Sequence, residues 1–278
     1  MAEHSPLVAI TDPDDPRVSA YRDIRERDLV GRQGKFIAEG TVVLNMMAAH
    51  HGGPQGFVAE SLLILENRVE GLADLLPRFP SDVPVYVASS AVMDAIAGFP
   101  MHRGVLALGR REAVLSLADR LALLPDEALV VVAAGLSNHD NMGSVFRNAA
   151  AFGVGMVVMD ETSCDPLYRK ALRVSVGSVL SVPYSREGSI LTCLEALQAE
   201  GFDVWGLSPR GECEVGNLPL SRRMALVLGT EGEGLPDQVL SRFRNARIAQ
   251  HPGLDSLNVA TASGIALYSI ASRRGMLP

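Results

Sequence analysis

Short apolar runs alternate with longer amphipathic stretches from about residue 35 to the end of the chain. In the first hundred residues the apolar runs are short, rich in β-branched side chains and bounded by glycine or proline, a pattern typical of strands. These runs are "KFIAEG", "GFVAE", "VPVYVAS" and "RGVLALG". Helices are predicted between them over residues 41–50 and 91–96. Strands that alternate with helices predict an α/β unit of about 100 residues.

The alternation restarts after "RREAVLSLADRLALLPDEA", which we interpret as a charged connection. The later apolar runs predict six strands, with helices over residues 142–152 and 190–200: "LVVVAAG", "GMVVMD", "VLSVPYS", "FDVWGLS", "MALVLG" and "ARIAQ". Strands that are apolar throughout and separated by helices predict a parallel sheet with helices on both faces. We therefore expect an α/β chain with a first domain at residues 1–109, a linker at 110–126 and a second domain at 127–278.

Composition narrows the class of protein. The 278 residues are 47% hydrophobic, which is enough apolar material for one large domain or two modest ones. No apolar run reaches the roughly 18 residues of a membrane span, and the first residues lack the basic-then-apolar order of a secretion signal, so we expect a cytoplasmic protein with no membrane partner. Cys164, Cys193 and Cys213 lack metal-pair spacing, as do the six histidines, so we expect reduced thiols and no metal.

The net charge of −7 argues against a protein whose whole surface binds nucleic acid. One segment of the chain is nevertheless locally basic. This segment, "RVSAYRDIRERDLVGRQGK", predicts a basic helix followed by a basic loop. Two interpretations stay open: a solvated helix with paired charges, or an arm that contacts RNA phosphates. The candidate RNA-binding residues are Arg17, Arg22, Arg25, Arg32 and Lys35.

Three loops of the second domain hold the candidate chemistry, because ligands in open α/β sheets bind beyond the carboxyl ends of the strands. In "GLSNHDNMGSVFRNAAAFGV", Asn141 opens a helix and Arg147 follows nearly two turns later. An N-cap asparagine and a surface arginine are the plain alternative there. The loop "QHPGLDSLNVA" places Ser256 and Asn258 at the start of the last helix.

The third loop, "LVLGTEGEGLP", combines three glycines with Glu231 and Glu233. Glycine-rich turns after strands often bind phosphate through backbone N–H groups. This loop has no Lys, Ser or Thr after its last glycine, and its carboxylates would repel a polyphosphate. We therefore expect its ligand to be neutral or cationic.

Three segments, taken in order, resemble the sequence motifs of the SpoU (TrmH-like) branch of SPOUT RNA methyltransferases. They are "NMGSVFRNAAAFGV", "LVLGTEGEGLP" and "DSLNVATASGIALY", within residues 127–274. A looser resemblance, over residues 15–109, links "RVSAYRDIRERDLVGRQGKFIAEG" and "HRGVLALG" to the ribosomal-protein-like substrate-binding domain of that family. The resemblance implies a trefoil-knotted α/β domain, S-adenosylmethionine as methyl donor, a homodimer, and methylation of a ribose 2′-hydroxyl in rRNA or tRNA.

The resemblance also implies which residues form the site. Cofactor contacts are expected mainly from backbone groups, at Leu228, Gly229, Glu231, Gly234, Ile248, Gln250, Leu257 and Asn258. The catalytic set is Asn141, Arg147, Glu231, Ser256 and Asn258. In members of the family, the arginine at this position is described as a general base. Because a guanidinium stays protonated at neutral pH, we interpret Arg147 as stabilising the developing alkoxide. Ala249, Gln250 and Pro252 depart from the common family pattern.

Two other classes of function stay open. A nucleotide-binding α/β enzyme is disfavoured, because no G-x-G-x-x-G or P-loop follows the early strands. The other alternative is a catalytically silent RNA-binding protein of the same fold.

Overall fold

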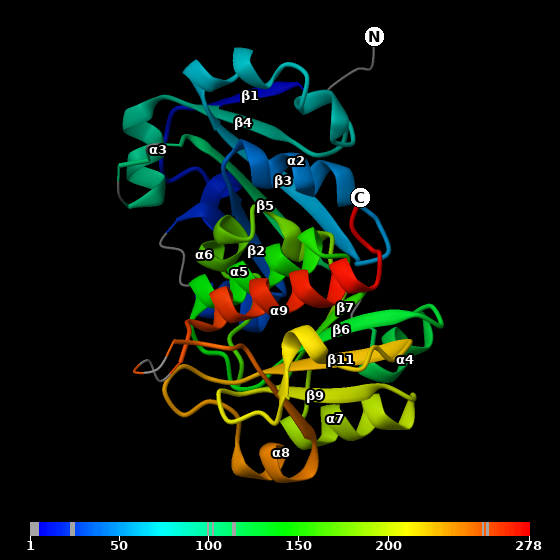
Figure 1. Ribbon diagram of the computed structural model, residues 1–278. Coiled ribbons are helices and arrows are strands. Elements are labelled where there is room, and N and C mark those ends of the chain that lie inside the picture. Colours follow the sequence, from blue (N-terminus) through cyan, green and yellow to red (C-terminus); the bar gives the residue numbers. More distant parts are fainter. Residues whose placement is uncertain are drawn as a thin grey trace. The chain divides into compact units, whose positions relative to one another are not determined.

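The computed structural model describes residues 6–22, 26–98, 100–101, 103–112, 115–251, 253 and 256–278. Contacts between Cα atoms divide the chain into two compact units. The first is Met1–Val114 together with Leu167–Ser181, and the second is Leu115–Pro166 together with Val182–Pro278. Each unit contains one sheet with helices packed against it (Figure 1).

The first unit has a five-stranded mixed sheet in the order β1-β4-β3-β5-β2. Its strands are β1 Leu7–Ile10, β2 Lys35–Glu39, β3 Phe57–Leu65, β4 Val85–Ala88 and β5 Val105–Arg111. Strand β5 runs antiparallel to both β2 and β3. The carboxyl ends of β2 and β3 therefore meet the amino end of β5 at one edge of the sheet.

The helices of the first unit come from two parts of the chain. They are α1 Glu26–Gln33, α2 Thr41–His50, α3 Ser90–Ala97 and α6 Arg169–Val174, with 3₁₀ turns at Pro16–Tyr21, Glu66–Arg68, Glu70–Leu72, Leu76–Arg78 and Ser178–Leu180. The sequence pattern predicted α2 and α3 to within a residue. The pattern did not indicate that α6, which begins 130 residues after the end of β2, packs against that strand.

The second unit has a seven-stranded sheet in the order β10-β12-β9-β11-β6-β7-β8, and every neighbouring pair is parallel. The predicted parallel sheet is thus confirmed. Its elements are α4 Leu117–Ala122, β6 Ala128–Ala133, α5 His139–Ala151, β7 Met156–Met159, β8 Tyr184–Arg186, α7 Ile190–Ala199, β9 Asp203–Leu207, β10 Cys213–Glu214, a 3₁₀ turn Val215–Asn217, β11 Arg223–Leu228, α8 Asp237–Arg242, β12 Arg244–Arg247 and α9 Val259–Arg273.

Central strands of this sheet are buried on both faces, which explains their continuous apolar sequence. Val130 and Val132 of β6 face a core that includes Leu121 of α4 and Leu194 of α7. The alternate residue Val131 is also fully buried. Among the described residues, no helix is both long and apolar enough to cross a membrane.

Two local predictions differ from the structure. Part of the stretch interpreted as a linker forms helix α4, because Leu117 and Leu121 are buried in the core of the second unit. The run "VLSVPYS" was predicted as one strand, yet Ser178–Leu180 is a 3₁₀ turn and β8 begins only at Tyr184. Proline has no N–H to donate to a strand ladder, and β8 pairs with β7 from Tyr184 onward. The trefoil knot implied by the resemblance stays a prediction.

Candidate functional site

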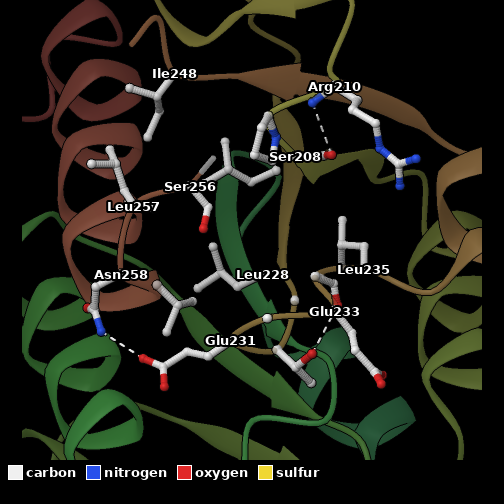
Figure 2. A pocket seen from close by; sticks show the side chains of 18 of the residues that line it. Ser208, Arg210, Leu228, Glu231, Glu233, Leu235, Ile248, Ser256, Leu257 and Asn258 are labelled. Atoms are coloured by element: carbon white, nitrogen blue, oxygen red, sulfur yellow. Dashed lines mark hydrogen bonds between the residues drawn. The ribbon is translucent and has the colours of Figure 1, made fainter. Parts of the chain in front are cut away.

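A cavity of about 500 Å³ opens at the carboxyl ends of β9, β11 and β12 in the second unit (Figure 2). Three adjacent parallel strands end there, so the loops that follow them converge. The lining includes Ser256 of the predicted catalytic set and all eight residues predicted to contact the cofactor: Leu228, Gly229, Glu231, Gly234, Ile248, Gln250, Leu257 and Asn258. Leu228 and Asn258, 30 positions apart in the sequence, therefore share one pocket.

The glycine loop between β11 and α8 closes on itself. Thr230 N–H donates to Gly234 O at 3.1 Å, and Gly234 N–H donates back to Thr230 O at 3.2 Å. A Cβ at Gly229 would lie 2.3 Å from the carbonyl carbon of Gly234, so only glycine fits there. Gly234 has φ +75°, a conformation that side chains with a Cβ rarely adopt. The glycines are thus required by the closed loop, which presents its backbone to the cavity.

Three polar side chains meet beside this loop. The Asn141 amide donates to Glu231 Oε1 at 2.5 Å, and the Asn258 amide donates to the same oxygen at 2.8 Å. The Asn258 amide also approaches Asn141 Oδ1 at 3.1 Å. Figure 2 shows Asn258 and Glu231 pointing toward each other at the rim of the cavity. This cluster joins the three motif loops, and it orients the Glu231 carboxylate.

Both asparagines sit near helix starts, but only one is an N-cap. Asn258 caps α9, because its Oδ1 accepts from the N–H groups of Ala260 and Thr261 at 2.9 and 3.3 Å. At α5 the cap is Asn138, whose Oδ1 accepts from Asp140 N–H at 2.8 Å and from Asn141 N–H at 3.3 Å. The expectation that Asn141 opens the helix was therefore wrong. Asn141 lies in the first turn, buried, and its amide is free to hold Glu231.

Arg147 does not line the cavity of its own chain. It is exposed on α5, and among the described residues it makes no hydrogen bond or ion pair. Arg147 is six positions after Asn141, so the two side chains point about 240° apart around the helix axis. The next residue, Asn148, binds α9 instead: its amide donates to Ala260 O at 2.9 Å and to Ser263 Oγ at 2.8 Å.

The loop after β9 also lines the cavity, although none of its residues was predicted as a site residue. Leu207, Ser208, Pro209 and Arg210 contribute to the wall. The Arg210 N–H donates to Ser208 Oγ at 3.3 Å, which shapes the turn. The sequence does contain a signal for this loop: the predicted strand "FDVWGLS" ends there, and ligands of such sheets bind beyond the carboxyl ends of strands.

The basic segment near the start of the chain is largely neutralised where the structure describes it. Arg17 pairs with Asp15 at 2.5 Å, Arg22 with Asp14 at 2.5 Å, and Lys35 with Glu60 at 2.7 Å. Hydrogen bonds from Arg17 lower the pKa of the Asp15 carboxyl to about 2. Arg25 lies outside the described residues, and so does the side chain of Arg32. These ion pairs favour the solvated-helix interpretation for the described members.

The thiols and possible metal ligands are dispersed. Cys193 is buried, and Cys164 and Cys213 are partly buried; all three are free thiols. Burial raises the pKa of the Cys164 and Cys193 thiols to about 11. Within the described ranges, no three His, Cys, Asp or Glu side chains gather as metal ligands would. Pro252, one of the departures from the family pattern, lies outside those ranges.

Known proteins match this chain over most of its length. An uncharacterized tRNA/rRNA methyltransferase of Mycobacterium bovis is 39% identical over 269 residues, which cover 93% of this chain and 90% of the relative. The 23S rRNA (guanosine-2′-O-)-methyltransferase RlmB of Escherichia coli is 28% identical over 198 residues, covering 69% of this chain and 80% of RlmB.

Solved structures share the fold. The AdoMet-bound rRNA methyltransferase from Sinorhizobium meliloti superposes with a TM-score of 0.79 at 23% identity, covering 98% of this chain and 99% of that one. The model of the SpoU rRNA methylase family matches residues 128–268, which hold the cavity and the asparagine–glutamate cluster. The chain therefore belongs to the SpoU rRNA methylase family.

Proposed function

We propose that this member of the SpoU family transfers a methyl group from S-adenosylmethionine to a ribose 2′-hydroxyl of rRNA or tRNA. The observation that carries the proposal is the cavity itself. A closed glycine loop with two glutamates and no basic side chain faces the loop before α9 across it. RlmB of E. coli, a relative that covers 69% of this chain, is named as a 2′-O-methyltransferase.

The lining suits S-adenosylmethionine chemically. The cavity of about 500 Å³ falls within the range of small-molecule sites. The cofactor carries sulfonium and ammonium cations, which favour the carboxylates of Glu231 and Glu233, and a carboxylate that suits Arg210. Its adenine presents hydrogen-bonding edges that backbone groups at Gly229, Ile248 and Leu257 can pair. When bound, it supplies an activated methyl group.

The remaining chemistry belongs to the chain. Asn141 and Asn258 hold Glu231 at the rim, so the carboxylate keeps one orientation. We assign to Arg147 the stabilisation of negative charge that develops on the ribose oxygen, and to Ser256 a contact at the cavity rim. The requirement for a 2′-hydroxyl makes the substrate RNA rather than DNA. We place this activity in the cytoplasm, where rRNA and tRNA are found.

We also propose that the chain acts as a homodimer through α9. Ile265 and Tyr268 on this helix are large apolar residues with 43% and 56% of their surface exposed. Because Arg147 is exposed and lies outside the cavity of its own chain, a subunit interface would leave it available to a substrate bound there. Two-fold symmetric dimers are the commonest assembly of soluble oligomers.

Two measurements test the activity. Calorimetry with S-adenosylmethionine should show binding that survives a chelator, and NAD should give no heat. Mapping of 2′-O-methyl groups in rRNA and tRNA, from cells with and without the protein, should reveal at least one lost position. Absence of cofactor binding would overturn the proposal. Cofactor binding without any lost methyl group would favour a silent RNA-binding protein.

A further inference from the structure

A second cavity of about 500 Å³ lies in the first unit, at the sheet edge where β2 and β3 end and β5 begins. It is lined by Glu39, the start of α2 at residues 40–43, Arg68, Arg103, Arg173 and Val176. These residues come from four separate segments of the chain. The methyl-transfer chemistry proposed above uses none of them.

Three guanidinium groups converge on this cavity. Arg68 follows β3, Arg103 precedes β5 and Arg173 lies on α6, and all three are exposed. Within the described part of the chain, Arg68 makes no ion pair. The Arg103 guanidinium lies against Gly40, where a Cβ would approach its Nη1 to 3.2 Å. In a chain with a net charge of −7, such a concentration of positive charge favours an anionic ligand.

The start of α2 adds backbone donors. The N-cap is Gly40, which has φ +91° and offers no capping side chain. The first bond of the helix runs from Leu44 N–H to Gly40 O at 3.1 Å, so the N–H groups of Thr41, Val42 and Val43 have no partner within the helix. The first turn carries no acidic residue. Free N–H groups at a helix start bind anions well, and here they line the same cavity as the arginines.

Glu39 adds a hydrogen-bond acceptor to the cavity. Its side chain is only 10% exposed, and its carboxylate lies 3.8–3.9 Å from the guanidinium nitrogens of Arg103, Arg169 and Arg173. These distances are too long for hydrogen bonds, and no described residue donates one to Glu39. Buried carboxylates ordinarily accept hydrogen bonds, so the site has unused acceptor capacity beside its positive charges. An inorganic anion alone would leave this capacity unused.

We propose that this cavity binds one nucleotide of the RNA substrate. The phosphate lies between the start of α2 and the guanidiniums of Arg68 and Arg103, and Glu39 accepts a hydrogen bond from a ribose hydroxyl or a base N–H. A nucleotide carries a phosphate that the arginines can bind and, beside it, hydrogen-bond donors that the Glu39 carboxylate can accept. The inference rests on the proposed function for the identity of the RNA, but the binding site itself can be tested without any methyl transfer.

The first experiment titrates the full chain with inorganic phosphate and with the four nucleoside 5′-monophosphates, followed by amide NMR signals of residues 40–43. At least one nucleotide should bind tenfold or more tightly than phosphate. Glu39→Leu, which has no acceptor atom in its side chain, should remove that advantage while phosphate binding is kept or strengthened, because a repelling charge is lost. Equal binding of phosphate and all nucleotides in the native chain would overturn the proposal, as would an unchanged nucleotide advantage in Glu39→Leu.

The second experiment compares Arg103→Glu with Arg222→Glu in filter binding of total rRNA and tRNA over a salt series. Arg222 is a matched control, because its side chain is 74% exposed and its nearest carboxylate is 3.9 Å away in the second unit. Arg103→Glu should weaken RNA binding at least tenfold and reduce the slope of log affinity against log salt by about 0.7–0.9. Equal effects of the two variants would contradict the assignment.

Calorimetry with S-adenosylmethionine controls for folding, since all three variants should bind it as the native chain does. The two proposals then fail separately. A chain that binds nucleotides at residues 40–43 but methylates no RNA refutes only the proposed function. A chain that methylates RNA, yet shows neither nucleotide binding nor an Arg103 effect, refutes only this inference. Displacement of RNA by an acidic peptide, with no effect of nucleotides, would assign the cavity to a protein partner and also refute it.

Discussion

Two glutamates at the cavity of the second unit differ in their hydrogen-bond partners. Glu231 and Glu233 are two positions apart on the same exposed loop, but only Glu231 accepts hydrogen bonds from two asparagine amides. One of those donors, Asn141, is only 6% exposed. A buried donor that loses its acceptor costs about 1–3 kcal/mol, whereas an exposed carboxylate without partners costs little to remove.

We therefore expect Glu231→Ala to lower the free energy of unfolding by about 1–3 kcal/mol and Glu233→Ala to change it by less than about 0.5 kcal/mol. Urea denaturation followed by circular dichroism measures both. The pair is matched in residue type and loop. If the two variants have the same stability, the asparagine–glutamate cluster does not hold the loop.

Arg147 is exposed and lies outside the cavity, so its substitution should affect the proposed chemistry without affecting cofactor binding. Arg147→Ala should reduce the rate of methyl transfer by about 10²–10³, the usual loss when one donor to a developing oxyanion is removed. S-adenosylmethionine affinity should stay within twofold of the native value. Arg147→Lys should recover little activity, since an ammonium lacks the planar fork of a guanidinium. Initial rates with radiolabelled cofactor, together with calorimetry, check this, and a fully active Lys variant would show that a point charge suffices.

At the scale of elements, the β11–α8 connection depends on one close backbone approach. Gly229 passes so near Gly234 that a methyl group would overlap its carbonyl carbon at 2.3 Å. Backbone cannot move aside as a flexible side chain can, so the loop must open to relieve the overlap. Gly216, in the 3₁₀ turn before β11, has no atom within 4 Å of the place where its Cβ would lie.

Gly229→Ala should therefore weaken S-adenosylmethionine binding at least tenfold, while Gly216→Ala should leave it unchanged. Calorimetry on the two variants measures the contrast, and circular dichroism shows whether each still folds. Native-like affinity in Gly229→Ala would mean that the loop adapts and that its closed form is not needed for the cofactor.

For the whole molecule, the exposed apolar side chains of α9 favour assembly. Tyr268 packs edge-on against Phe152, with ring centroids 6.0 Å apart, and still leaves 56% of its surface exposed. Ile265, on the same helix, also leaves 43% of its surface exposed. Burial of such side chains against a second copy removes apolar surface from water.

Light scattering should accordingly give a mass of two 29.6 kDa chains at micromolar concentration. Tyr268→Glu should shift the mass toward one chain, because it places a charge in the apolar contact. Leu123→Glu is the control: Leu123 is 74% exposed but lies next to α4, away from α9 in the sequence. A native mass of one chain would contradict the dimer, and equal dissociation by both variants would place the contact elsewhere.

The sequence by itself determined the features that depend on local pattern. Strand and helix periodicity identified the parallel sheet of the second unit, and the conflict between glycines and glutamates indicated a ligand other than a polyphosphate. Three motifs in order indicated the family, and the eight residues expected at the cofactor line one cavity. These inferences succeeded because residues close together in the sequence, or at equivalent strand ends, are placed by backbone geometry that all such folds share.

Only the tertiary structure decided which distant side chains meet. Asn138 rather than Asn141 caps α5, and Asn141 is instead bound to a glutamate 90 residues away. Arg17 and Arg22 pair with neighbouring acids, whereas Glu39 shares a cavity with Arg68, Arg103 and Arg173. Local periodicity says which face of an element is buried, but not which element covers it. Contacts between residues far apart in the chain depend on the order and direction of strands in the folded sheet, and these decided where the charges of this protein gather.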